Sequence, residues 1–177
     1  MDFNSKEYLI PLSSYNIDVF PMLYDSEIEG AYKNCYVRRT VANMLLRIKN
    51  DLPDNLKLVV LDGYRSRKTH LDYCEKTEIE HLKDETKYST GGVVTVMLVP
   101  SDCSTKSLKD VVDNIDTIDV DLIKEIFESH GFMQAVANLH YEFEFGTKDW
   151  ASKNNCESYY DVIDDIEYSD RVVREEG

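Results

Sequence analysis

The sequence predicts an α+β fold, because it contains segments typical of both kinds of secondary structure. Residues 58–61 and 93–99 are short apolar runs rich in β-branched side chains, which is the composition of buried strands. Residues 36–50 and 120–130 carry apolar side chains every three or four positions, which is the pattern of amphipathic helices. Strands and helices are therefore both expected to contribute to one hydrophobic core.

The first helix and the first strand lead to a candidate site residue. In the segment 36–50 the apolar stripe consists of Val37, Val41, Leu45 and Ile48, and Pro53 ends the helix. Strand 58–61 is followed by Asp62-Gly63, a dipeptide that favours a turn. Arg65 is therefore expected just beyond the end of a buried strand.

The middle of the chain is predicted to contain a helix over 66–84 and then the central strand. Good helix formers fill 66–84, although their apolar stripe is loose. The pair Gly91-Gly92 permits a tight bend, and residues 93–99 are apolar or β-branched on both alternating faces. A strand that is apolar on both faces belongs in the middle of a sheet.

The last third is predicted to contain a connector, a helix and a half-buried strand. After a connector at 107–119, the helix 120–130 has Leu122, Ile123, Ile126 and Phe127 as its core face and Gly131 as a C-cap signal. Residues 139–145 alternate, with Tyr141, Phe143 and Phe145 on one face and His140, Glu142 and Glu144 on the other. One face of this strand is thus polar.

Length and charge restrict the class of protein. A chain of 177 residues can bury roughly 70% of its unfolded surface, which predicts a single domain over 1–162 and an acidic C-terminal extension over 163–177. A net charge of −14 opposes binding to nucleic acid or to an anionic membrane surface. The excess of acidic residues forms either a solvated surface that keeps the protein soluble or a surface that attracts a cationic ligand or partner.

Targeting signals and cofactor motifs are missing from the sequence. It has no basic leader followed by an apolar run and no apolar stretch of about 18 residues, so a cytoplasmic protein is expected. The cysteines at 35, 74, 103 and 156 form no C-x-x-C pair and are interpreted as reduced, mostly buried thiols. No nucleotide-binding motif is present, and no cofactor is predicted.

Four segments, taken in order, resemble one known family. They are Tyr36-Val37-Arg38-Arg39, Leu61-Asp62-Gly63-Tyr64-Arg65, Ser89-Thr90-Gly91-Gly92, and Phe143-Glu144-Phe145-Gly146 with Trp150-Ala151. In this order and spacing the chain resembles the D-Ala-D-Ala dipeptidase family, which includes the enzymes of vancomycin resistance, over roughly residues 20–162. The resemblance implies an α+β fold with a central antiparallel sheet flanked by helices, and a zinc active site.

The positions at which the family holds its metal carry other residues in this chain. The resemblance places Tyr88 at the family's first histidine ligand, Thr95 at its aspartate ligand and Glu142 at its second histidine ligand. Leu139 occupies the position of the catalytic glutamate. Zinc needs about three protein ligands, and of these residues only Glu142 could coordinate it directly. The resemblance therefore predicts a degenerate member without zinc peptidase activity, and no metal site.

Arg65 is retained at the position where the family's arginine stabilises negative charge on the attacked carbonyl. Two interpretations of it remain: a clamp for an anion or carbonyl, or a structural partner of a buried carboxylate such as Glu142. The candidate catalytic residues are Arg65, Tyr88 and Glu142. The candidate ligand-binding set is Arg65, Tyr88, Ser89, Thr95, His140 and Glu142. Glu144 could line the same metal-free pocket. In the alternative interpretation Tyr88 and Thr95 only fill space, and His140 and Glu144 are exposed to solvent. His70 and His81 are predicted to lie on a helix surface and are assigned no role.

Three functional hypotheses follow from these residues. The first is a pseudoenzyme whose former cleft binds a small amino-acid-like or peptide-like ligand, or a protein partner. The second is a metal-independent enzyme that reuses the cleft on an amino-acid-derived substrate in a biosynthetic pathway. The third is a dipeptidase with a rearranged metal site that uses His140 and Glu142.

Overall fold

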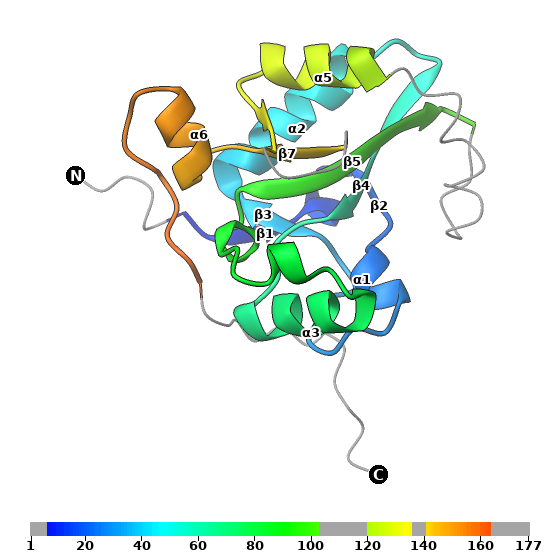
Figure 1. Ribbon diagram of the computed structural model, residues 1–177. Coiled ribbons are helices and arrows are strands. Elements are labelled where there is room, and N and C mark those ends of the chain that lie inside the picture. Colours follow the sequence, from blue (N-terminus) through cyan, green and yellow to red (C-terminus); the bar gives the residue numbers. More distant parts are fainter. Residues whose placement is uncertain (1–6, 103–119, 136–140, 164–177) are drawn as a thin grey trace.

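The computed structural model describes residues 7–102, 120–135 and 141–163, and they form a mixed α+β structure. A five-stranded sheet in the order β2-β4-β5-β7-β6 lies between α2 and α5 on one side and α1 and α3 on the other (Figure 1). The strands of this sheet are β2 (Asp18–Val19), β4 (Leu56–Asp62), β5 (Val93–Pro100), β6 (Met133–Gln134) and β7 (Glu142–Glu144). The α+β class predicted from the sequence is confirmed.

The helices and the smaller sheet complete the described fold. The α-helices are α1 (Met22–Asp25), α2 (Arg39–Asp51), α3 (Arg67–Thr77), α5 (Val120–Ser129) and α6 (Lys148–Lys153). Three 3-10 turns are η1 (Leu12–Tyr15), η2 (Glu80–Leu82) and η3 (Lys87–Ser89). A second, two-stranded sheet pairs β1 (Leu9–Pro11) with β3 (Tyr36–Arg38).

The pairing of the large sheet is antiparallel except at one edge. Strands β4, β5, β7 and β6 pair antiparallel, as the family resemblance implies, whereas β2 pairs parallel to β4. Strand β5 is central, as its two apolar faces predict. Its even-numbered side chains, with Phe143, pack against α2 and α5 in the main core, where Phe143 stacks on Phe127 at 4.5 Å.

Several element boundaries differ from the sequence predictions. Residues 36–38 form β3 and not the first turn of a helix, because their backbone pairs with β1. Helix α3 ends at Thr77, far short of residue 84, since Glu78 adopts a left-handed conformation (φ 57°) that stops it. In α5 Ile123 and Phe127 are buried, but Leu122 is 38% exposed and does not belong to the core face.

Other sequence predictions concern the cysteines and the segments around 107–119 and 139–145. Cys35 and Cys74 are buried free thiols as expected, whereas Cys156 is exposed. Cys103, the connector 107–119, residues 139 and 140, and the extension from 164 onward lie outside the described residues. Gly91 has a φ of +80°, which confirms the bend predicted before β5.

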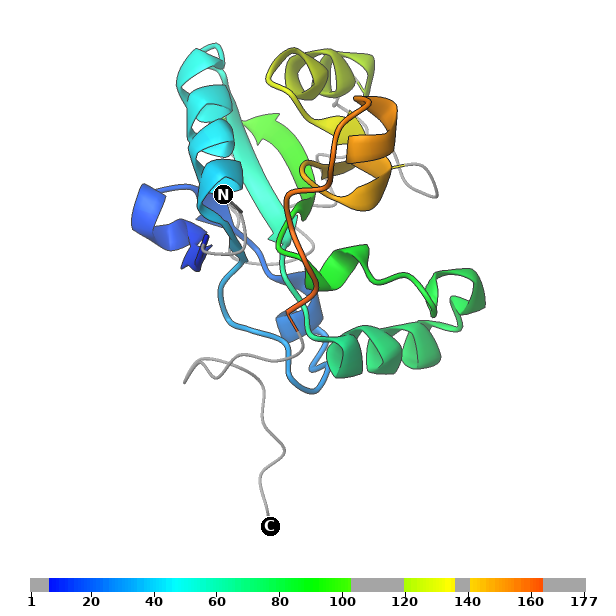
Figure 2. The same cartoon turned by 90° about the vertical axis from the view of Figure 1, so that its left-hand side faces the viewer.

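After α6 the chain continues as an extended segment, residues 156–163, which we call the strap (Figure 2). It is attached at several points: the amides of Tyr159 and Tyr160 donate to Gly146 O, and Arg38 Nη2 donates to Asp161 O at 2.9 Å. The Ile163 amide donates to Ser89 O at 2.8 Å, next to the candidate site. No helix within the described residues is long and apolar enough to cross a membrane.

Candidate functional site

Arg65 lies two residues after Gly63, where the chain has left β4, and its side chain is buried with 4% exposure. Its guanidinium carbon is 4.2 Å from the ring centre of Tyr88 and 4.7 Å from that of Tyr73. Its ion pair is with Asp62, with Nη2 3.6 Å from Oδ2. The donors Nε and Nη1 are buried and have no hydrogen-bond partner among the described residues. The guanidinium therefore retains unused hydrogen-bonding capacity.

A row of three polar side chains crosses the sheet close to Arg65. In the strand register Asp62 of β4 is opposite Thr95 of β5, and Thr95 is opposite Glu142 of β7. Side chains opposite one another in a sheet project from the same face, so the three lie on one face of the sheet. Asp62 was not predicted as a site residue, although its position at the end of a strand, three residues before Arg65, was a usable signal.

Tyr88 connects the turn η3 to this row. Its hydroxyl donates a hydrogen bond of 2.7 Å to Glu142 Oε1. Burial raises the pKa of Glu142, while the Tyr88 hydrogen bond and the charges of Lys87 and Arg65 act in the opposite direction. Arg65, Tyr88, Thr95 and Glu142, singled out separately in the sequence, are thus brought together. Glu142 accepts a hydrogen bond from Tyr88, whereas Arg65 forms its ion pair with Asp62 and not with Glu142.

A second pair, Lys87 and Glu144, lies beside the pair formed by Tyr88 and Glu142. The sequence did not indicate that Lys87 and Glu144 pair. Lys87 precedes Tyr88 in η3, and Glu144 lies two residues after Glu142 on the same face of β7. Lys87 Nζ is 3.2 Å from Glu144 Oε2, and Glu144 is fully buried and also accepts a hydrogen bond from Thr147. Of the two interpretations of Glu144, exposure to solvent is therefore ruled out. The available signal was the polar face of the predicted strand 139–145, on which Glu144 lies two residues after Glu142.

The opposite charges of Lys87 and Glu144 stabilise each other. Burial by itself would lower the pKa of Lys87, but the carboxylates of Glu144, Glu142 and Glu85 raise it above its ordinary value. Burial raises the pKa of Glu144, opposed by Thr147 and Lys87. Lys87 is therefore a protonated, largely buried cation that also acts on Glu142.

His70 is another residue whose predicted position was wrong. It lies on α3 but is completely buried, and its ring stacks on Tyr88 with centres 4.9 Å apart. Its Nε2 is 2.6 Å from Leu82 O and therefore carries the proton and donates, while Nδ1 is buried without a partner among the described residues. Burial and the nearby Arg65 lower the pKa of His70 to about 4. The imidazole is thus neutral. His81, by contrast, is exposed as expected.

The remaining candidates are Ser89, Thr95 and His140. Ser89 is fully buried, and its Oγ has no hydrogen-bond partner among the described residues. Thr95 is half-buried. His140 lies outside the described residues, so its candidate role remains a prediction from the sequence. Three residues around Tyr88 thus carry a buried polar atom without a hydrogen-bond partner among the described residues. Arg65 and His70 contact the Tyr88 ring, and Ser89 follows Tyr88 in the sequence.

The residues at the family's metal positions do not fit a zinc site. Tyr88 is a hydrogen-bond donor to Glu142, so its phenol is protonated, and Thr95 offers only a hydroxyl. Structural and catalytic zinc ions are held by thiolates, imidazoles and carboxylates, and Glu142 alone among these three residues belongs to that group. Within the described ranges no cluster of three or more His, Cys, Asp or Glu residues is arranged to hold a metal ion.

The arrangement can, however, bind a polar molecule and move protons. Arg65 offers two unused donors suited to a carboxylate or a polarised carbonyl. Asp62 and Glu142 offer carboxyl groups whose pKa values are both raised by burial, and Tyr88 offers a hydroxyl. Polar groups that converge and have shifted pKa values make these residues a candidate binding site.

Comparisons with known proteins add one likeness of fold. No protein family and no curated protein sequence matches the chain. Among solved structures it is similar to the vancomycin-resistance D,D-dipeptidase VanXYg, determined in complex with a phosphinate analogue of D-Ala-D-Ala. The alignment covers 86% of this chain and 73% of the dipeptidase chain, with 14% sequence identity and a TM-score of 0.42.

Proposed function

We propose that this protein is a dipeptidase-like pseudoenzyme that binds a small amino-acid-like or peptide-like ligand around Arg65, Tyr88 and Glu142 without a zinc ion. The observation that carries this proposal is the buried guanidinium of Arg65, whose Nε and Nη1 have no hydrogen-bond partner among the described residues. Buried donors without partners are uncommon, because each costs about 1–3 kcal/mol. A ligand oxygen that accepts from these donors would remove that cost.

The chemistry of the surroundings indicates which ligand groups fit. A carboxylate or carbonyl oxygen matches the planar edge of the Arg65 guanidinium. An ammonium group matches Asp62 and Glu142, whose charged forms are disfavoured by burial and would be stabilised by a nearby cation. A molecule with both groups, such as an amino acid or a short peptide, satisfies the two requirements together.

The sequence resemblance supports the same conclusion from another direction. It places Arg65 at the family's arginine that stabilises negative charge on the attacked carbonyl, and it places Tyr88, Thr95 and Glu142 at the family's metal positions. The residue that interacts with the carbonyl is thus retained and the metal ligands are replaced. This combination is expected of a protein that still binds but no longer hydrolyses by zinc chemistry.

Calorimetric titration with D-Ala-D-Ala and with single amino acids, in the presence of a chelator, tests the proposal. We expect binding that Arg65→Gln weakens by about 10- to 100-fold, because a hydrogen bond to a charged group contributes about 1.5–3 kcal/mol. Arg47→Gln, which removes an exposed arginine of α2, is the matched control and is expected to leave binding unchanged. Stoichiometric zinc in the purified protein together with chelator-sensitive cleavage of D-Ala-D-Ala would refute the proposal.

A second candidate function, metal-independent catalysis, is favoured by the state of Glu142. A buried carboxyl whose pKa is raised by burial and that is hydrogen-bonded to a phenol is suited to proton transfer. Glu142→Gln keeps an acceptor for Tyr88 but cannot take up a proton. If the protein is an enzyme of this kind, an allele carrying Glu142→Gln reproduces the phenotype of a gene deletion although the protein still folds and binds. A normal phenotype would exclude proton transfer by Glu142.

A further inference from the structure

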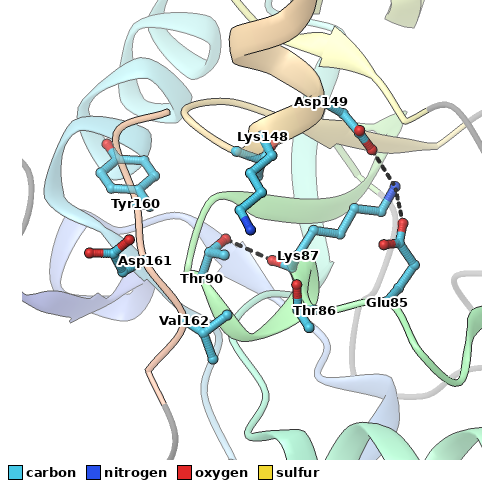
Figure 3. A pocket seen from close by; sticks show the side chains of 10 residues that line it. Glu85, Thr86, Lys87, Thr90, Lys148, Asp149, Tyr160, Asp161 and Val162 are labelled. Atoms are coloured by element: carbon cyan, nitrogen blue, oxygen red, sulfur yellow. Dashed lines mark hydrogen bonds and ion pairs between the residues drawn. The ribbon is translucent and has the colours of Figure 1, made fainter. Parts of the chain in front are cut away.

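A pocket of about 300 Å³ lies next to η3 and is lined by none of Arg65, Tyr88, Thr95 or Glu142. Three segments border it: residues 85–90 around η3, the start of α6, and the strap (Figure 3). Its lining residues are Glu85, Thr86, Lys87, Thr90, Thr147, Lys148, Asp149, Tyr160, Asp161 and Val162. It is therefore distinct from the site of the proposed function, although η3 contributes Lys87 to one and Tyr88 to the other.

The positive charge that remains available in this pocket belongs to Lys148. Lys87 already has Glu144 at 3.2 Å, and its charge is compensated. The Lys148 side chain extends across the pocket toward Thr90 (Figure 3), and it has no ion pair or hydrogen bond within the described part of the chain. An exposed ammonium group without a partner, positioned over a pocket, can accept the charge of a ligand carboxylate.

Three carboxylates line the pocket, those of Glu85, Asp149 and Asp161, and the first two are only partly used. Glu85 and Asp149 approach Lys87 Nζ at 3.7 and 4.0 Å, beyond the usual hydrogen-bond length, and their side chains are 38% and 49% exposed. Their oxygens can therefore accept hydrogen bonds from another cation. An acid is thus available on the η3 side, and a base and an acid are available at the start of α6. The ring of Tyr160 and the methyl groups of Val162 form the apolar wall on the side of the strap.

Two hydroxyl groups of the lining, those of Thr90 and Thr147, are in contrast already engaged in the fold. Thr90 Oγ1 donates to Lys87 O and accepts from the Gly92 amide, and Thr147 Oγ1 donates to Glu144 and accepts from the Trp150 amide. These bonds hold the walls in place and leave recognition to the charged groups. A pocket of this volume is at the small end of the range for ligand sites, about 300–1,000 Å³, so its ligand has few atoms.

We propose that this pocket binds a small zwitterion of amino-acid size, with its carboxylate on Lys148 and its ammonium group on Asp149 and Glu85. A molecule with only a carboxylate would meet the uncompensated acids, and a molecule with only an ammonium group would meet Lys148. Only a ligand that carries both charges matches Lys148 and the two acids together. The site does not depend on the function proposed for Arg65.

Three probes of similar size test this assignment by NMR titration: L-alanine, propionate, which lacks the amine, and ethylamine, which lacks the carboxylate. The titrations use the Arg65→Gln variant, so that the Arg65 site does not contribute, and the same amides are followed in the wild type in case that variant is unfolded. L-alanine is expected to shift the amides of residues 85–90, 147–149 and 160–162, and the two other probes to bind at least about tenfold more weakly.

Variants of α6 complete the test. Lys148→Gln is expected to weaken L-alanine binding by about tenfold or more, whereas Lys153→Gln, an exposed lysine of the same helix outside the pocket, leaves it unchanged. Equal binding of propionate or ethylamine, unchanged affinity in Lys148→Gln, or no shifts in these three segments would overturn the assignment. Binding at the pocket without binding at Arg65, or the reverse, separates this inference from the proposed function.

Discussion

Lys87→Met is expected to destabilise the protein by about 3–5 kcal/mol, because it leaves the fully buried carboxylate of Glu144 without its counter-charge. The Thr147 hydroxyl would still donate to Glu144, but a single hydroxyl does not replace a cation. The free energy of unfolding in urea, measured near neutral pH, gives the effect directly.

The double variant Lys87→Met/Glu144→Leu separates the loss of the pair from the loss of one partner. Replacing both charges by apolar side chains is expected to recover most of the stability, since a buried ion pair is worth little more than good apolar packing. Lys83→Met, at an exposed lysine nearby, is the control and is expected to change stability by less than about 0.5 kcal/mol. A single Lys87→Met variant as stable as wild type would show that Glu144 is not charged in the fold.

The second large effect is a dependence of stability on pH that arises from His70. Its pKa is lowered from 6.5 to about 4 in the folded protein, so between these pH values the unfolded chain binds more protons than the folded one. The contribution of His70 to stability is therefore lost as the pH falls through this window, by up to about 3 kcal/mol. Carboxyls with raised pKa values, such as Glu142, act in the opposite sense.

His70→Gln isolates the imidazole from those carboxyls, which the variant retains. The glutamine amide can still donate to Leu82 O, and it does not titrate. Urea unfolding at a series of pH values from 7 to 4 is expected to show a flatter profile for the variant than for wild type, while His81→Gln, at an exposed histidine, follows the wild type. Parallel profiles of His70→Gln and wild type would contradict a buried, neutral His70.

The parts of the fold that the sequence predicted well are those with a strong local pattern. The strands β4 and β5 are continuous apolar runs, and α5 has the 3.6-residue period, so local composition was sufficient. Strand β3 was missed because its three residues continue the apolar pattern of α2, and only pairing with the distant β1 makes them extended. The early end of α3 was missed because Glu78, not glycine, adopts the left-handed conformation.

The residues of the candidate site were easier to predict from the sequence than the contacts between them. The resemblance to the dipeptidase family was enough to choose Arg65, Tyr88 and Glu142, and these residues do lie together. The partners of these residues depend on how the segments pack. Nothing local indicated that Asp62 and not Glu142 forms the ion pair with Arg65, or that His70 turns inward onto Tyr88.

The hydrogen bonds that attach the strap are made by its main chain, and this has a consequence for how related proteins can diverge. Its contacts use the amides of Tyr159, Tyr160 and Ile163 and the carbonyls of Asp161 and Ile163, the last of which accepts from the Tyr64 hydroxyl. Every residue type except proline supplies both kinds of group. The side chains at 161 and 162 can therefore be exchanged without detaching the strap, so an altered ligand preference could arise there by point mutation while the scaffold stays intact.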